Sequence, residues 1–192
     1  MGQETIYLLL AVTMFTTIVL AAYLLALRQE VKQQDPPIIV LPEAEGYYFG
    51  AGSAALSGDF ENRLRRLVIP RLREIGATYD ATVIEVIGHT DEIPLHGHGQ
   101  LPSNLDAVLV PMFVGDAPAE PVAADNAGLG MARAVAVARF MRESGLSSKF
   151  TIIPLSAGPF LKPDDTALSA GEAVADEARR RIEVRLRRRE HR

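Results

Sequence analysis

One stretch of this chain, residues 5–27, contains no Asp, Glu, His, Lys or Arg in 23 consecutive positions. At a rise of ~1.5 Å per residue, a helix of that length reaches about 34 Å, enough to cross a hydrocarbon core of ~30 Å. We therefore expect a transmembrane helix at residues 5–27, preceded by a short tail at residues 1–4. Because the span holds no ionisable side chain of these types, we interpret it as an anchor and not as an ion-conducting helix.

Two other structures can also contain such an apolar run, namely a cleaved signal peptide and the buried helix of a soluble protein. A signal peptide has a basic leader, a core of roughly 7–15 residues and a small-x-small cleavage site. Here the leader MGQE contains no Lys or Arg, and the run ends in Leu25, Ala26 and Leu27. A buried helix of this length without a charge would be unusual in so small a domain. We therefore prefer the membrane anchor.

The charges that flank the span give a weak prediction of its orientation. Arg28 and Lys32 follow the span, and no basic residue precedes it. Taken alone, the positive-inside rule then places the C-terminal part of the chain in the cytoplasm. Two basic residues make a small bias, so a functional argument can outweigh it.

Composition excludes several classes of function. The net charge is −4, so no overall positive field recruits nucleic acid. The chain has no cysteine, which excludes disulfides, thiol nucleophiles and thiolate metal sites. After the span, residues 28–44 are polar and then punctuated by prolines, which indicates a linker. Residues 45–192 have the mixed composition of one soluble domain.

The soluble domain alternates between strand patterns and helix patterns. The predicted elements are a strand at 47–49, a helix from Ser57 with Pro70 inside it, strands at 82–87 and 150–155, a helix at 127–143 and a last strand at 181–187. The last strand alternates strictly between apolar and charged residues, which predicts one buried face and one wet face. The order β-α-β-α-β-(link)-β predicts an α/β two-layer sandwich, a mixed sheet with helices on one face.

A long segment at residues 92–125, rich in Gly and Pro, interrupts this pattern. Connections inside compact domains are usually much shorter, and a long one tends to be functional or flexible. The run AVLVPMFV predicts a short helix or strand of its own within it. We expect an inserted loop that covers the site, widens it for another ligand or docks a partner.

Three ordered motifs resemble a known family. They are GHTD at 88–91 after a strand, NAGLGMARAV at 126–135 opening a helix, and RRRIEVRL at 179–186 in the last strand. Together they resemble the OmpA-like peptidoglycan-binding domain, whose pattern is GHTD, then N-x-x-L-S-x-x-R-A, then N-R-R-V-E-I. The resemblance covers residues 47–188. Gly130 stands where the family has Ser, and Arg179 stands where it has Asn.

The resemblance implies a ligand and a set of binding residues. The family binds the peptide stem of peptidoglycan through diaminopimelate, whose side chain ends in an ammonium and a carboxylate. Asp91 would accept hydrogen bonds from the ammonium, and Arg133 would bind the carboxylate through its planar guanidinium. Thr90 and Asn126 would assist, Arg181 would lie on the neighbouring strand, and the helix N-terminus would add backbone donors.

The residues themselves leave structural alternatives open. Arg133 lies in the least polar part of its helix, where a guanidinium needs an anionic partner. That partner is either a ligand or a protein carboxylate such as Glu92 or Asp125. Asp91 follows a strand, where aspartate is also common as a turn or capping residue.

Other kinds of site have weaker support. His89, His96 and His98 resemble a metal-binding pattern, but a solvated Gly-rich loop explains the last two better. Ser-His-Asp catalysis has no supporting motif such as G-x-S-x-G. We therefore expect no enzyme activity, no cofactor and no metal. The basic C-terminal run RLRRREHR is interpreted as a solvated strand end.

Together these features predict a single-pass protein of the bacterial inner membrane whose periplasmic domain binds peptidoglycan non-covalently. The peptidoglycan wall lies outside the cytoplasm, which outweighs the weak charge bias. One span followed by such a domain resembles MotB-type stator subunits, although their membrane Asp is missing here. The alternative is an accessory subunit whose domain serves protein–protein interaction through residues 92–125. A polytopic inner-membrane protein and a second copy of the chain are the expected protein partners, and nucleic acid is not.

Overall fold

The computed structural model describes residues 2–95, 102–116, 119–168, 173 and 175–189. The chain divides into two compact units, residues 1–35 and residues 36–192. His96 and His98, whose spacing resembles a metal-binding pattern, lie outside the described residues.

The first unit is a single helix, α1 (Gln3–Gln33), and its stretch Gln3–Glu30 is long and apolar enough to cross a membrane. None of the apolar window within that stretch is buried by protein. Its threonine hydroxyls donate to carbonyls one turn earlier, for example Thr17 Oγ1 to the carbonyl of Thr13 at 2.8 Å. The helix therefore carries few unsatisfied polar groups, as a hydrocarbon environment requires.

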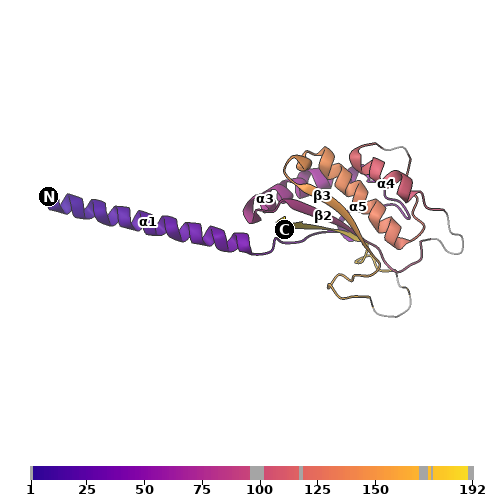
Figure 1. Cartoon of the computed structure of the whole chain (residues 1–192). Coiled ribbons are helices and arrows are strands. Elements are labelled where there is room, and N and C mark those ends of the chain that lie inside the picture. The colour runs from indigo at the N-terminus through magenta and orange to yellow at the C-terminus, as the bar shows by residue number, and fades with distance from the viewer. Residues whose placement is uncertain (1, 96–101, 117–118, 169–172, 174, 190–192) are drawn as a thin grey trace. The chain divides into compact units, whose positions relative to one another are not determined.

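The second unit is built on a four-stranded mixed sheet, with strand order β1-β4-β2-β3 (Figure 1). The strands are β1 (Ile39–Pro42), β2 (Val83–His89), β3 (Thr151–Gly158) and β4 (Arg181–Arg187). Strands β2 and β3 are parallel, and β4 is antiparallel to both β1 and β2. This pairing brings the carboxyl end of β2 beside the amino end of β4, because Gly88 pairs with Ile182.

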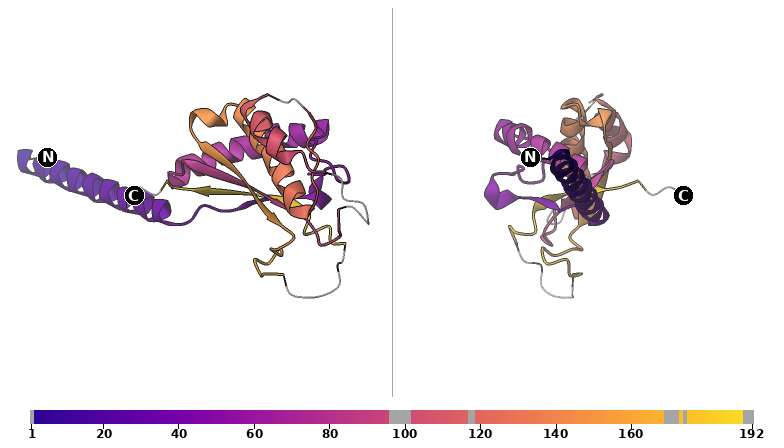
Figure 2. Two further views of the ribbon diagram at one scale, coloured as in Figure 1. Left: turned by 45° about the vertical axis from the view of Figure 1, so that its right-hand side comes forward. Right: turned by 90° about the vertical axis from the view of Figure 1, so that its left-hand side faces the viewer.

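The helices cover one face of this sheet and enclose the core (Figure 2). They are α2 (Gly58–Arg63), α3 (Ile69–Tyr79), α4 (Leu105–Val114) and α5 (Asn126–Glu143). In the core, Phe60, Leu72 and Met141 of the helices pack with Ile84 and Val184 of the sheet. All five residues are 0% exposed. The predicted two-layer α/β sandwich with helices on one face is thus confirmed.

The irregularity expected at Pro70 takes the form of a π-helical segment, Leu64–Val68, between α2 and α3. Proline has no amide hydrogen to donate to the preceding turn, so a change of helical pitch just before it is the natural response. The helix then continues to Tyr79, and Asp80 ends it in the left-handed conformation.

The first strand differs from the prediction. Tyr47 to Phe49 form no strand beyond one isolated bridge between Phe49 and Leu56, and the edge strand is Ile39–Pro42. It lies within residues 28–44, predicted as a linker, whose first residues also extend α1 to Gln33. Pro42 is the last residue of this strand, and a proline is tolerated on an edge strand, where its missing donor faces no partner.

The second face of the sheet differs from the prediction at its first two charged residues, which are buried, whereas Arg185 is half-buried and Arg187 is exposed. Arg181 and Glu183 of β4 are each only 4% exposed. Arg181 donates to Glu183 Oε1 from Nε at 2.8 Å, and Arg185 donates to Glu183 Oε2 at 2.7 Å. Residues 159–168 lie on this side of the sheet, away from the helices (Figure 2), and Arg181 donates to the carbonyl of Lys162. Strict alternation therefore marked an apolar face and an ionic face, and the ionic face is buried at Arg181 and Glu183 and open to water at Arg187.

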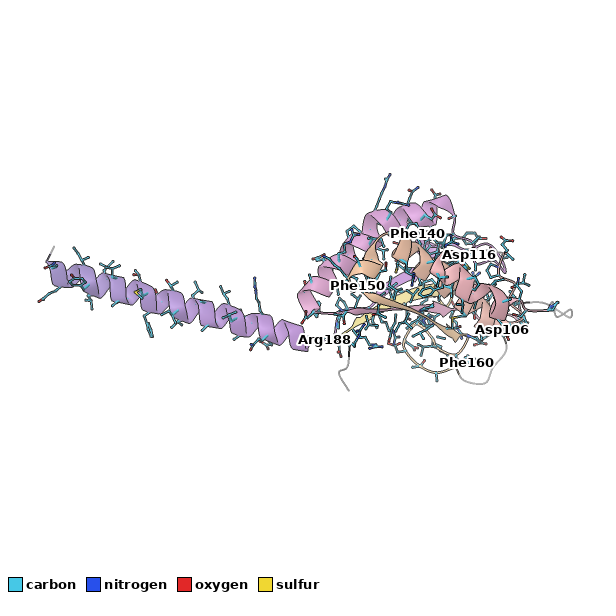
Figure 3. The ribbon with its side chains drawn as sticks, turned by 45° about the horizontal axis from the view of Figure 1, so that its top comes forward. Asp106, Asp116, Phe140, Phe150, Phe160 and Arg188 are labelled. Atoms are coloured by element: carbon cyan, nitrogen blue, oxygen red, sulfur yellow. The ribbon has the colours of Figure 1, made fainter. Side chains whose placement is uncertain are left out.

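The predicted insertion forms helix α4, which packs against α5. Asp106 and Asp116 lie near its two ends (Figure 3). Asn104 joins the start of α4 to the segment that precedes α5. Its side chain donates to the carbonyl of Glu120 at 2.9 Å and accepts from the amide of Val122 at 2.7 Å. Val110 and Val114 of α4 remain exposed. The remaining short turns are the 3₁₀ segments η1 (Glu43–Glu45) and η3 (Leu146–Ser148).

Candidate ligand-binding site

A cleft of about 350 Å³ lies where the carboxyl end of β2, the first turns of α5 and the residue before β4 converge. Four of the five predicted ligand residues line it: Thr90, Asp91, Asn126 and Arg133. Asp91 and Arg133, which are 42 positions apart in the sequence, are thus brought to one cleft. We call it the Asp91–Arg133 cleft.

The carboxylate of Asp91 lies at the wall of this cleft and is only 8% exposed as a residue. Its Oδ2 accepts from Nη1 of Arg180 at 2.6 Å. Its Oδ1 accepts from the amide of Ile93 at 3.3 Å, so Asp91 also has the turn role considered from the sequence. A carboxylate offers about four lone-pair sites, so two such bonds leave acceptor capacity for a ligand cation.

Arg133 is buried in α5, with 6% exposure, and its guanidinium is held by backbone carbonyls. Nε donates to the carbonyl of Ser53 at 3.0 Å, and Nη2 donates to the carbonyl of Gly50 at 3.3 Å. The guanidinium also lies 4.9 Å from the ring centroid of Phe49, a cation–π distance. Neither Glu92 nor Asp125 pairs with it, because Glu92 binds Arg179 and Asp125 caps α5.

Asn126 and Thr90 support the cleft from its floor. The Asn126 amide donates to the carbonyls of Asp91 at 3.2 Å and Ile93 at 2.8 Å, which joins the start of α5 to the loop after β2. The backbone amide of Thr90 donates a hydrogen bond to the carbonyl of Gly158 at 3.0 Å. Among the described residues, its buried hydroxyl has no hydrogen-bond partner. A buried hydroxyl beside a cleft is available to a ligand group.

The fifth predicted residue, Arg181, is not brought to this cleft. Its side chain points to the opposite face of the sheet, where Glu183 neutralises it. The expected backbone donors at the start of α5 are also partly occupied, since Asp125 Oδ1 accepts from the amide of Gly128 at 2.7 Å. The side chains of Arg133 and Arg180 supply the cations of the cleft.

Two glycines allow α5 to approach the end of β2 closely enough to form the cleft. A Cβ on Gly88 would lie 1.9 Å from the carbonyl oxygen of Gly130, and a Cβ on Gly130 would lie 2.6 Å from Ser156 Oγ. That hydroxyl donates to the carbonyl of Ala127 at 2.7 Å. A serine hydroxyl from β3 thus lies where a side chain at position 130 would project.

The charges around the cleft are balanced. Glu43 and Asp91 supply two carboxylates, and Arg133 and Arg180 supply two guanidiniums. Burial lowers the pKa of Arg133, and the nearby carboxylate of Glu43 opposes that shift. The hydrogen bonds that Arg180 donates to Glu43 raise the pKa of Arg180 despite its partial burial. Both guanidiniums remain charged at neutral pH, since arginine does not deprotonate in proteins.

Comparison with solved structures supplies the fold. The periplasmic domain of MotB aligns with 82% of this chain and 66% of that chain, at a TM-score of 0.53 and 16% sequence identity. The soluble unit has a MotB-like fold. A Helicobacter pylori MotB periplasmic domain covers 80% of this chain and 81% of its own, at 16% identity and a TM-score of 0.47.

A protein described as MotB-like, from Desulfovibrio vulgaris, covers 80% of this chain and 75% of its own, at 20% identity and a TM-score of 0.44. The chain matches no protein-family model and no curated protein sequence. The expected resemblance to an OmpA/MotB-type domain is therefore confirmed at the level of the fold.

Within this MotB-like fold, sequence reasoning missed two residues of the cleft, Arg180 and Glu43. Arg180 joins Glu43 and Asp91, with Nε 2.6 Å from Glu43 Oε2. The alternation of β4 carried a signal for Arg180, because it shares parity with Ile182 and Val184 and so faces the helices. Glu43 had no signal, since the strand that precedes it was predicted as a linker.

The described residues contain no group of three or more His, Cys, Asp or Glu that could hold a metal ion. His89 is buried beside Glu183 on the ionic face of the sheet, with Nε2 3.4 Å from Glu183 Oε1. The chemistry available to the Asp91–Arg133 cleft is therefore the recognition of paired opposite charges.

Proposed function

We propose that this protein is a membrane-anchored module that binds peptidoglycan non-covalently, through the diaminopimelate side chain of the stem peptide. It would tether the membrane, or a membrane complex, to the cell wall. The observation that carries the proposal is the pairing of Asp91 and Arg133 in one cleft. The end of diaminopimelate carries an ammonium and a carboxylate close together, which is the charge pattern that such a cleft complements.

Each group of that zwitterion has a partner in the cleft. The ammonium would bind Asp91, which keeps acceptor capacity beside Arg180. The carboxylate would bind Arg133, whose fixed guanidinium is preorganised for a planar anion. Arg180 is the further cation within reach of the same carboxylate, because it is held at Asp91 by Glu43. The balanced protein charges suit a ligand end with no net charge.

The proposed location follows from this ligand. Helix α1 would cross the bacterial inner membrane once, and the MotB-like unit would lie in the periplasm, where peptidoglycan is found. The chain leaves the possible membrane span at Glu30 and enters β1 at Ile39. The absence of a charged side chain from residues 5–27 supports an anchor, with any ion pathway supplied by a polytopic partner.

A retention experiment tests the proposal. Full-length protein in detergent is incubated with purified diaminopimelate-type sacculi, sedimented and quantified. We expect the wild type to sediment and Asp91→Asn and Arg133→Lys to remain in solution. Asp59→Asn and Arg71→Lys are matched controls, because both residues are exposed and lie outside the cleft. Equal sedimentation of all five proteins would overturn the proposed site.

A second candidate function is supported by the exposed apolar side chains of α4. Val110 is 71% exposed and Val114 is 61% exposed, an unusual pattern for a helix in water. The domain would then serve mainly as a protein-interaction module of an inner-membrane complex. Failure of the wild type to sediment with sacculi, together with loss of a co-purifying membrane protein in Val110→Ser/Val114→Ser, would favour this function over the first.

A further inference from the structure

A second and larger cleft, of about 590 Å³, adjoins the Asp91–Arg133 cleft. The two clefts share Ala51 and Gly52 as lining residues. A ligand bound in the first cleft therefore needs to cross only one turn of the chain to enter the second. None of the five predicted ligand residues lines this second cleft.

Apart from the exposed Glu120 and the cation described below, the walls of the second cleft carry small or apolar side chains. One wall is the segment 51–55, which contains three alanines, and the other is the segment 119–123, together with Met112 of α4. Such walls leave room for a polypeptide backbone with small side chains between them. A volume of this size falls within the range of about 300–1,000 Å³ that is usual for ligand pockets.

The insertion supplies the second wall, and specific contacts fix it. Asn104 bonds both the carbonyl of Glu120 and the amide of Val122. Leu105, the first residue of α4, packs so closely on Gly128 that a Cβ there would lie 2.8 Å from its Cδ1. The cleft is therefore held open by the protein and does not depend on a ligand to form.

Arg133 connects the two clefts physically. Its guanidinium donates to the carbonyls of Gly50 and Ser53, which are the ends of the turn that contains the shared residues. The amide of Ser53 also donates to the carbonyl of Gly50 at 3.0 Å. The residue proposed to bind the ligand carboxylate in the first cleft thus also positions the wall of the second.

Arg139 provides a cation at the second cleft. Its Nε donates to Glu143 Oε1 at 2.7 Å. Among the described residues, its two terminal nitrogens have no hydrogen-bond partner, and its side chain is 29% exposed. A guanidinium with free donors beside an apolar cleft is suited to a carboxylate. The end of a peptide chain carries such a group.

We propose that the second cleft is a subsite for the stem peptide that continues from the diaminopimelate held in the first cleft. Residues with small side chains, such as alanine, would pack between the two walls, and the terminal carboxylate would bind Arg139. The inference rests on the proposed function, and it assigns the inserted segment the role of widening the binding site.

Affinity measurements with two peptides test the inference on full-length protein in detergent. The probes are L-Ala–D-Glu–diaminopimelate and the same peptide extended by D-Ala–D-Ala. Because the longer peptide adds apolar contacts and a charge-assisted bond at Arg139, we expect it to bind the wild type about tenfold more tightly. Ala55→Trp would fill the second cleft, since Ala55 lines it and is exposed, and Arg139→Gln would remove the cation.

Both variants should bind the two peptides equally, with the affinity that the wild type has for the shorter one. Ala77→Trp and Arg142→Gln are the controls, because neither residue lines the second cleft, and both should keep the tenfold preference. Equal affinity of the wild type for the two peptides overturns the inference and leaves the proposed function standing. A preference that persists in both variants also overturns it. Absence of binding to either peptide by the wild type overturns the proposed function, and the inference with it.

Discussion

Two buried arginines on opposite faces of one sheet have very different surroundings. Arg181 is 4% exposed and pairs with the carboxylate of Glu183. Arg133 is 6% exposed, donates to backbone carbonyls and lies over an aromatic ring, with the carboxylates of Glu43 and Asp91 nearby but not bonded to it among the described residues. The first guanidinium is neutralised inside the protein. The second faces a cleft, and an anionic group of a ligand would complete its charge pairing. Equal burial therefore does not mean equal function, and the partner decides between a structural and a binding role.

The largest effect is expected on the ionic face. Glu183→Gln leaves Arg181 buried without a full counter-charge, and breaking such a pair typically costs about 3–5 kcal/mol of unfolding free energy. Chemical denaturation of the full-length protein measures the loss. Glu74→Gln is the control, because Glu74 pairs with Arg71 on the surface, where an ion pair contributes little. If Glu183→Gln lowers the unfolding free energy no more than the control does, the buried pair on the ionic face contributes no more to stability than a surface ion pair.

The second prediction concerns the cleft. Arg133→Gln removes the cation proposed for the ligand carboxylate, so the affinity for a diaminopimelate tripeptide should fall about a hundredfold, or ~2.7 kcal/mol. Arg181→Lys keeps a charge beside Glu183 and should leave that affinity unchanged. Titration calorimetry on both variants gives the comparison. If Arg181→Lys weakens binding as much as Arg133→Gln, the assignment of roles to the two arginines is wrong.

The third prediction tests the close approach that forms the cleft. Gly130→Ala should destabilise the fold by ~1 kcal/mol, because the new Cβ displaces Ser156 Oγ from its bond to Ala127. Gly88→Ala should cost more, since its Cβ would meet a backbone carbonyl that cannot rotate away. Thermal unfolding of the two variants measures which substitution destabilises the fold more. A smaller loss for Gly88→Ala than for Gly130→Ala would contradict the contact.

The smallest effect is the pH dependence of the ionic face. Burial alone raises the pKa of Glu183, but the adjacent imidazole of His89 and the hydrogen bonds from Arg185 and Arg181 lower it below its ordinary value. A carboxyl whose pKa is lowered by folding adds stability above its unfolded pKa of about 4.3 and loses that stability as the pH falls further. Wild-type stability should therefore decline below about pH 4, and the part of that decline due to Glu183 should be missing in Glu183→Gln.

Much of the fold followed from patterns of apolar residues. Strand β4 has the predicted bounds, and α5 begins one residue before its prediction. The alternation in β4 was correctly assigned to two faces, but a pattern of charges does not tell whether water or a counter-ion will surround them. That outcome depends on Glu183 reaching Arg181 and on residues 159–168 covering them, both of which are tertiary contacts.

The site was predictable only in part for a similar reason. Motif resemblance indicated Asp91 and Arg133, and the fold brings both to one cleft. Glu43 follows a strand of four residues, Ile39–Pro42, which lies within the predicted, proline-punctuated linker. The second cleft depends on how α4 and residues 119–123 return to the domain, and no local pattern specifies that path. Local periodicity predicts elements, whereas a site formed by an insertion is set by packing.

We infer that Asp91 and Arg133 recognise both charges of one zwitterionic side chain. Calorimetry with two tripeptides tests it most directly, one with diaminopimelate and one with lysine in its place, which lacks only the terminal carboxylate. We predict that the wild type binds the diaminopimelate peptide at least about tenfold more tightly and that Arg133→Gln loses most of this preference. Equal affinity of the wild type for the two peptides would contradict it.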